Sequence, residues 1–259
     1  MIKRIIIFPD IHGRTFWRRP YNKYKNDPKT LFIFLGDYFD PYPDIDGITP
    51  EDAYKNFEEI WETCKDNKNV IFLLGNHDWH YLPMQWNSYG CRRSKFYLKT
   101  ISDFFIRNLD KFDIGYEFYI KDKCYLFTHA GVLNGWVKDN FDIENLREAY
   151  TSQFLNNLKY SDKFQKTLWQ ISASRFGEDP YGSPLWADIF EHELEGNEFN
   201  KEYNIYQIFG HTLGHPSLYE FDINDTYAML DCEQAFVLDC ETEKITTYNK
   251  YIEPDRWPV

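Results

Sequence analysis

Clusters of metal-capable side chains recur along this chain, each at the end of a short apolar run. The first is Asp10-Ile11-His12-Gly13, where two residues spaced two apart project to the same side of an extended segment and could hold one ion. Gly36-Asp37-Tyr38-Phe39-Asp40 and Gly75-Asn76-His77-Asp78 each begin with a glycine that lets the backbone turn sharply. Thr128-His129-Ala130-Gly131 and Gly210-His211-Thr212 complete the series. One such cluster arises easily by chance, but five in order predict a common site.

The donor atoms of these clusters restrict the metals that they suit. They are imidazole nitrogens, carboxylate oxygens and an amide oxygen, and no cluster contains a thiolate. This set matches Mn, Fe, Zn or Ni, and it is a poor match for Cu(I) or iron–sulfur sites.

A scaffold must bring the ends of these apolar runs together. The runs are rich in β-branched and aromatic residues and predict buried strands over 5–8, 31–35, 70–74, 125–127 and 205–209. Apolar residues at helical spacing predict helices over 51–65, 94–109, 142–158 and 161–176. Strands that alternate with helices indicate an α/β domain, in which sites gather at strand ends. Three later runs, 227–230, 235–238 and 244–248, predict an antiparallel meander that builds a second sheet.

Length and composition favour one folded domain. The 259 residues are enough for a single large core, and no repeat or linker divides them. Hydrophobic residues at 43% and charged residues at 27% are close to globular averages, which excludes a disordered chain. We therefore expect one domain over residues 1–259, with helical caps or insertions at about 81–122 and 136–199, and we place substrate selection in the second insertion.

Charge, aromatic content and cysteine use narrow the functional classes further. The 41 acidic and 29 basic residues give a net charge of −12, which disfavours a long nucleic acid or an anionic membrane as a partner. The aromatic content of 19% indicates a bulky core rather than a stacking platform. The five cysteines form no CxxC motif, and the chain has neither a signal-peptide core nor a membrane-length apolar run. These features predict a cytoplasmic protein with reduced thiols.

Taken in order, the motifs D-x-H, G-D-x-x-D, G-N-H-D, a single His and G-H resemble those of the calcineurin-like metallophosphoesterases. The resemblance spans Asp10 to His211, most of the chain. The segments 10–13, 128–131 and Ser183-Pro184-Leu185-Trp186-Ala187-Asp188 are similar to the branch of phosphoprotein phosphatases and bacterial diadenosine-tetraphosphate hydrolases. The resemblance implies a four-layer α/β/β/α sandwich of two mixed sheets flanked by helices, with the metal site at strand ends.

The resemblance also implies a dinuclear metal centre. It assigns one ion to Asp10, His12 and Asp37, and the other to Asp37, Asn76, His129 and His211, so that Asp37 bridges the two. Two cations about 3.5–4 Å apart stabilise both the attacking and the leaving oxygens of a phosphoryl displacement and generate hydroxide for in-line attack at neutral pH. Expulsion of an alkoxide needs a proton donor. His77 is placed for that role, and Asp40 would orient its imidazole.

Two departures from the family pattern bear on the site. Position 213 is Leu, where many members have a second ligand His, and the phosphatase branch also lacks that His. His215 could reach the site from the next turn, but Pro216 beside it indicates a loop and disfavours ligation. Asp40 is followed by Pro41, where the branch usually continues toward a phosphate-binding arginine. Phosphate oxygens still require a cationic partner. The candidates are Arg14, Arg92, Arg93 and Arg175, whereas His80 and His192 lie outside the motifs and are expected behind the ligands or at the surface.

Three functions are compatible with these residues. The first is hydrolysis of a phosphate monoester by metal-bound hydroxide, with His77 as the general acid and manganese among the suitable metals. The second is hydrolysis of a dinucleoside polyphosphate or another phosphodiester. The third is a metal-stabilised interaction scaffold. Such scaffolds commonly lose the acid histidine, so His77 favours an enzyme.

Overall fold

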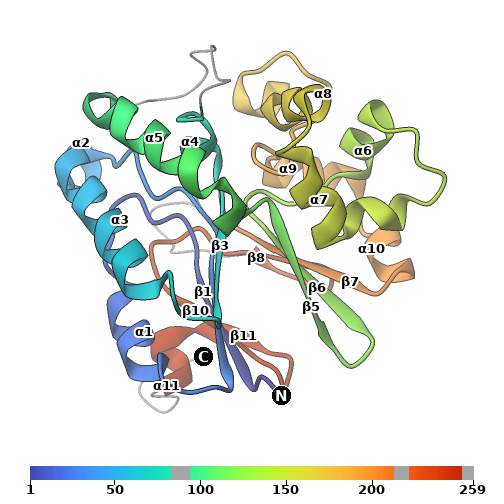
Figure 1. The fold of residues 1–259 in the computed structure, drawn as a ribbon. Helices are drawn as coiled ribbons and strands as arrows, with labels where there is room; N and C mark the ends of the chain where they lie inside the picture. Colours follow the sequence, from blue (N-terminus) through green and yellow to red (C-terminus); the bar gives the residue numbers. More distant parts are fainter. Residues whose placement is uncertain (83–93, 213–221, 253–259) are drawn as a thin grey trace. The chain divides into compact units, whose positions relative to one another are not determined.

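The computed structural model describes residues 1–82, 94–212 and 222–252, which form two compact units (Figure 1). The first unit contains most of residues 1–112 and the segment that begins at residue 233. The second contains residues 73–75 and most of residues 113–232. Each unit is built on its own mixed sheet with flanking helices, which confirms the predicted α/β class with two mixed sheets.

A six-stranded sheet with the order β11-β10-β1-β2-β3-β4 forms the first unit. Strands β1, β2 and β3 are parallel, and Phe8 pairs with Phe34, which pairs with Phe72. β10 is antiparallel to β1, and β11 is antiparallel to β10. The strands are β1 (Arg4–Phe8), β2 (Thr30–Phe34), β3 (Val70–Leu73), β4 (Phe112–Asp113), β10 (Phe236–Asp239) and β11 (Ile245–Thr247). The carboxyl ends of the three parallel strands therefore lie at one edge, as the sequence predicts.

The longest helix of the first unit, α3, begins as the sequence predicts. Thr49 accepts a hydrogen bond from the Asp52 main-chain N–H, Asp52 accepts one in return from the Thr49 N–H, and Pro50 occupies the first turn. The helices of this unit are α1 (Arg18–Tyr24), α2 (Pro43–Asp46), α3 (Pro50–Cys64), α4 (Asn76–Trp79), α5 (Leu98–Asn108) and α11 (Tyr248–Ile252), with short 3₁₀ helices at Lys95–Tyr97 and Leu109–Lys111.

Aromatic rings fill the core where α3 and α5 meet strand β4. Trp61 of α3 stacks on Phe112 with ring centroids 5.6 Å apart, and Phe57 meets Phe104 edge to face at 4.9 Å. Phe105 is fully buried in the same cluster. The interpretation of the aromatic content as a bulky core is confirmed for this unit.

The second unit contains a five-stranded sheet with the order β5-β6-β7-β9-β8. The three inner strands are parallel, and the two outer strands pair antiparallel to them. The strands are β5 (Gly115–Ile120), β6 (Lys123–Thr128), β7 (Ile205–Phe209), β8 (Asp222–Ile223) and β9 (Tyr227–Met229). The helices are α6 (Asn134–Asn140), α7 (Ser152–Leu158), α8 (Asp162–Gln165), α9 (Ile189–Glu195) and α10 (Glu198–Glu202), with 3₁₀ helices at Leu146–Tyr150, Lys166–Trp169 and Ala173–Arg175.

The predicted C-terminal meander is wrong in part: β10 and β11 form its antiparallel hairpin, but β9 does not pair with β10. β9 pairs in parallel with β7 in the second unit, whereas β10 and β11 extend the sheet of the first unit beside β1. Closeness in sequence favours a hairpin of β9 and β10, but β10 pairs instead with β1, an apolar strand that is buried except at Arg4. The second sheet is accordingly built mainly from residues 115–128 and 205–209.

Two predicted helices are broken into shorter pieces. Thr151 is extended and caps α7, which splits the helix expected over 142–158. Over 161–176 the main chain of Ile171 pairs with Asp179, and the Ile171 N–H also donates to the Asp179 carboxylate, so these groups cannot continue a helix. No helix within the described ranges combines the length and the apolar character that crossing a membrane requires. The predicted insertions at 81–122 and 136–199 stay predictions.

Candidate metal centre

The loops that follow β1 and β2 are joined through their main chains. The His12 N–H donates to the carbonyl of Asp37 at 2.7 Å, and the Ile11 N–H donates to Gly36 at 3.4 Å. Because β1 and β2 are parallel neighbours, both loops leave the same edge of the sheet. The first two predicted motifs are therefore in direct contact within the first unit.

Backbone strain coincides with the predicted site residues. Ten non-glycine residues of the described part of the chain have positive φ, a region that side chains disfavour. Five of the ten are predicted site residues: Asp10 (29°), His12 (41°), Asp37 (53°), Asp40 (58°) and His211 (66°). Such conformations persist only where surrounding contacts hold them, and they often mark functional sites.

Three side chains of the first unit converge at this edge. His12, Asp37 and His77 each offer a ligand atom within 4.8 Å of the others. His12 Nε2 lies 3.4 Å from Asp37 Oδ2, while its Nδ1 lies 2.7 Å from the carbonyl oxygen of Phe39. A carbonyl only accepts, so Nδ1 carries a hydrogen, and Nε2, on the side of Asp37, is the nitrogen placed to ligate a metal. This is how proteins orient a metal-ligating histidine, and the donor set fits a transition-metal ion.

The carboxylate of Asp78 supports the second motif, a role that the sequence motifs do not indicate. It is fully buried and accepts hydrogen bonds from the main-chain N–H groups of Asp37 (2.7 Å) and Tyr38 (2.9 Å). Asp37 Oδ1 in turn accepts from the His77 N–H at 2.9 Å. The third motif thus holds the strained loop of the second. In the sequence, the only indication of this contact is that an acidic residue, Asp78, directly follows His77.

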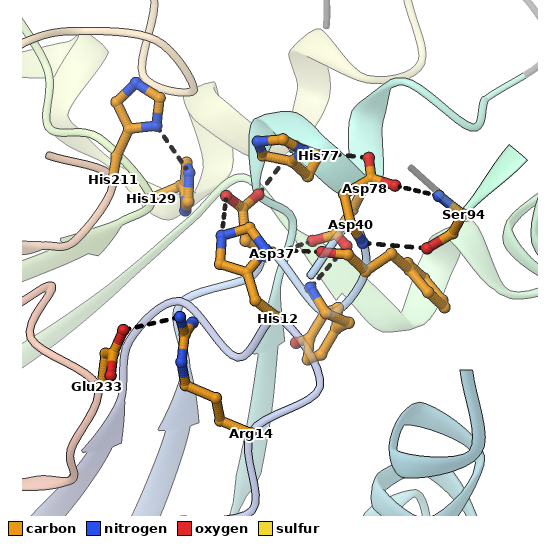
Figure 2. A network of polar contacts seen from close by, with 12 residues as sticks. His12, Arg14, Asp37, Asp40, His77, Asp78, Ser94, His129, His211 and Glu233 are labelled. Carbon is orange, nitrogen blue, oxygen red and sulfur yellow. Dashed lines mark hydrogen bonds and ion pairs between the residues drawn. The ribbon is translucent and has the colours of Figure 1, made fainter. Parts of the chain in front are cut away.

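His77 and Asp40 form the predicted pair (Figure 2). His77 Nδ1 lies 3.0 Å from Asp40 Oδ2, and the Asp40 side chain is completely buried. Asp40 Oδ1 accepts hydrogen bonds from the Tyr81 hydroxyl at 2.5 Å and the Ser94 N–H at 2.8 Å. Burial lowers the pKa of His77, but nearby carboxylates, Asp37 foremost, outweigh it and raise the pKa from 6.5 to about 9. The Asp40 carboxylate thus holds the imidazole of His77 at a fixed position.

In the second unit, His129 and His211 follow the parallel strands β6 and β7. His129 Nε2 lies 3.2 Å from His211 Nδ1, so the two imidazoles direct ring nitrogens toward each other (Figure 2). The His129 loop is held from behind by His192, whose Nε2 donates to the Ala130 carbonyl at 3.0 Å. Two imidazole nitrogens at this separation are suited to share one metal ion. His192 is buried behind a predicted ligand, in agreement with its expected position.

A comparison with protein families covers the part of the chain that contains these motifs. The sequence model of the family described as calcineurin-like phosphoesterase matches residues 3–215. The chain belongs to this family. No curated protein matches the chain.

Solved structures similar to this calcineurin-like phosphoesterase include phosphatases. A cold-active protein tyrosine phosphatase is 16% identical, with a TM-score of 0.54 over 95% of this chain and 79% of the other. A Saccharomyces cerevisiae protein serine/threonine phosphatase similar to human PP5 is 15% identical, with a TM-score of 0.47 over 92% of this chain and 73% of the other. A candidate diadenosine tetraphosphatase is 12% identical, with a TM-score of 0.48 over 95% of this chain and 93% of the other. At 16% identity, the similarity to the cold-active phosphatase shows a shared fold alone.

The remaining predicted residues differ in their surroundings. Asp10 and Asn76 are buried at the ends of their strands. Arg14 Nη2 forms ion pairs with Asp46 at 3.0 Å and Glu233 at 2.8 Å (Figure 2), so its charge is already neutralised on one side.

Arg175 lies against the loop of His211. His80 is buried, with its ring 6.0 Å from that of His77. Arg92, Arg93 and His215 lie outside the described residues.

Proposed function

We propose that this member of the calcineurin-like phosphoesterases hydrolyses a phosphate monoester and that His77 is its general acid. The observation that carries the proposal is the buried His77–Asp40 pair beside the potential ligands His12 and Asp37. A structural metal site would need no imidazole fixed beside it by a buried carboxylate. Water as the nucleophile agrees with family membership, since these proteins are generally metal-dependent hydrolases.

The family resemblance supports the proposed ligands, and the geometry within each unit agrees with it, since His12 lies beside Asp37 in the first unit and His129 beside His211 in the second. Asp10, His12 and Asp37 would hold one ion, and Asp37, Asn76, His129 and His211 would hold the other. When bound, the metal pair supplies positive charge to the phosphate oxygens and activates a water molecule for attack on phosphorus. Mn, Fe, Zn and Ni all suit these donors.

Residues of the first unit prepare the proton donor. Asp40 accepts from Tyr81 and Ser94 through one oxygen, which leaves its other oxygen directed at His77 Nδ1. His77 Nε2 is then the atom that would deliver a proton to the departing alkoxide. Because Asp40 is completely buried, its orientation toward the imidazole is maintained without competition from water.

A series of leaving groups tests the role of His77. We expect His77→Gln to lower kcat on alkyl phosphates by about 10²- to 10⁴-fold. The loss should be much smaller on p-nitrophenyl phosphate, whose leaving group departs without a proton. Asp103→Asn, which alters an exposed carboxylate paired with Lys99, is a control that should leave both rates unchanged. An equal loss on all substrates, together with weaker metal binding, would instead identify His77 as a ligand.

A substrate panel tests the monoester assignment. The Mn-loaded protein is compared on p-nitrophenyl phosphate, bis(p-nitrophenyl) phosphate and diadenosine tetraphosphate. We expect the highest kcat/KM on the monoester. Faster cleavage of the diester or of the dinucleotide would overturn the assignment in favour of a diesterase or a dinucleoside polyphosphate hydrolase. Tight metal binding with no turnover would favour a scaffold.

A further inference from the structure

His211 adopts a main-chain conformation that needs support from its surroundings. Its φ is 66°, in the left-handed region, where a residue with a Cβ is strained relative to the right-handed one. The side chain of His211 nevertheless points its Nδ1 at His129 Nε2 at 3.2 Å. The orientation of this imidazole therefore depends on whatever fixes the main chain at residues 211 and 212.

Arg175 supplies that support from a separate segment of the second unit. Its Nη2 donates to the main-chain carbonyl of His211 at 3.1 Å and to the hydroxyl of Thr212 at 2.8 Å. The same hydroxyl accepts from the Ile189 N–H at 3.3 Å. One guanidinium nitrogen thus contacts both consecutive residues of the loop that carries the imidazole.

The other end of the guanidinium is anchored to a rigid partner. Arg175 Nε lies 2.7 Å from Asp188 Oδ2, and the Asp188 side chain is only 7% exposed. Asp188 is the N-cap of α9 and accepts from the Phe190 N–H at 3.0 Å. Its own N–H donates to Glu191, which also accepts from Ser172 at 2.8 Å. The arginine is consequently held by a helix terminus that is itself fixed by several hydrogen bonds.

We propose that Arg175 is a positioning residue that holds His211 in its left-handed conformation and so aims the imidazole beside His129 for metal binding. The inference rests on the proposed function only in taking His129 and His211 as metal ligands. It assigns to Arg175 a task other than gripping phosphate. Two of its three nitrogens are already engaged: Nε lies in an ion pair with Asp188, and Nη2 donates to the His211 loop.

Metal affinity separates this role from general stabilisation. Metal-free Arg175→Met is titrated with Mn²⁺ by calorimetry, and we expect the affinity for one ion to fall by about 10- to 100-fold. Arg147→Met is the matched control, because Arg147 also donates to a main-chain carbonyl, that of Tyr150 at 3.0 Å, and to the Tyr119 hydroxyl at 2.8 Å in the same unit. Its Mn²⁺ affinity should equal that of the wild type.

A second variant keeps the test decisive if Arg175→Met does not fold. Arg175→Lys retains the charge, but its single nitrogen cannot reach both Asp188 and the His211 loop, so this variant should bind one Mn²⁺ ion more weakly. Added guanidinium ion should partly restore the Mn²⁺ affinity of Arg175→Ala. Wild-type Mn²⁺ affinity in a folded Arg175 variant overturns the proposal, and a raised KM with unchanged metal affinity identifies a phosphate clamp instead. If wild-type protein binds Mn²⁺ but hydrolyses no phosphate ester, the proposed function fails while the binding comparison still decides the role of Arg175.

Discussion

The carboxylate of Asp40 has no solvent contact, and every hydrogen bond described for it serves to hold one oxygen against His77. A buried carboxylate of this kind stabilises an imidazolium and fixes its orientation, as in other histidine-based acid–base systems. In the proposed mechanism, the chemistry of the site depends on this pair as much as on the proposed metal ligands.

Replacing Asp40 tests the pair directly. Asp40→Asn keeps the size of the side chain but removes the charge, so it should lower kcat on alkyl phosphates by up to about 10²-fold. Tyr81→Phe removes a single hydrogen bond to Asp40 and should have a smaller effect of the same kind. Steady-state kinetics on both variants provides the measurement. A larger loss in Tyr81→Phe than in Asp40→Asn would contradict this order of importance.

The sequence predicted the His77–Asp40 pair, but not the groups that support it. His77 and Asp40 belong to motifs whose strands are parallel neighbours, so their proximity follows from the fold. Ser94 bonds to Asp40 across 54 positions of the chain, and no periodicity or motif indicates that contact. Asp78 was visible beside His77, but its role depends on the exact path of the main chain at Asp37 and Tyr38.

At the scale of elements, the strands were predictable because burial on both faces leaves continuous apolar runs. All five strands expected to precede the motifs are present in the structure, and β7 has the predicted bounds, 205–209. Strand pairing was not predictable, because β9 and β10 are adjacent in sequence but pair with β7 and β1. The helices expected over 142–158 and 161–176 failed because side chains and turns captured the main-chain groups locally.

The turn after β6 has little tolerance for a side chain at Gly131. Its φ is 86°, and a Cβ there would collide with the His192 ring, whereas Gly47 has φ of 72° and no atom within 4 Å of an added Cβ. We expect Gly47→Ala to lower the free energy of unfolding by about 1 kcal/mol. Gly131→Ala should lower it by a further 1–3 kcal/mol or so, because of overpacking. Equal losses in urea denaturation would show that His192 does not confine this turn.

Burial of His192 links the stability of the second unit to pH. Burial lowers the pKa of His192 below its ordinary value of 6.5, outweighing the effect of its hydrogen bond to Ala130. Between the lowered pKa and 6.5, the unfolded chain binds more protons than the folded one, so the free energy of unfolding should fall as pH drops through this window.

The variant His192→Gln retains a donor for the Ala130 carbonyl but cannot titrate. Its free energy of unfolding should therefore fall less steeply than that of the wild type as pH drops below 6.5. Chemical denaturation at several pH values gives the comparison, and the difference between the two proteins isolates His192 from the other histidines. Identical slopes would mean that His192 is not buried as a neutral imidazole.

For the whole molecule, the family assignment and the acidic composition support each other. A net charge of −12 disfavours long polyanions, while a centre of two cations would attract a single phosphate group locally. The order of the motifs along the chain predicted both the family and the two mixed sheets. Substrate preference could not be predicted in this way, because it depends on side chains that no motif specifies.

The central claim is that metal bound by these motifs supports phosphate ester hydrolysis. Its most direct test measures phosphate release from p-nitrophenyl phosphate by chelator-stripped protein, before and after addition of Mn²⁺, for the wild type and for Asp37→Asn. We predict no turnover in the stripped protein, restoration by Mn²⁺ in the wild type, and at least about 10²-fold lower turnover in Asp37→Asn. Equal turnover with and without metal, or in both proteins, would contradict the claim.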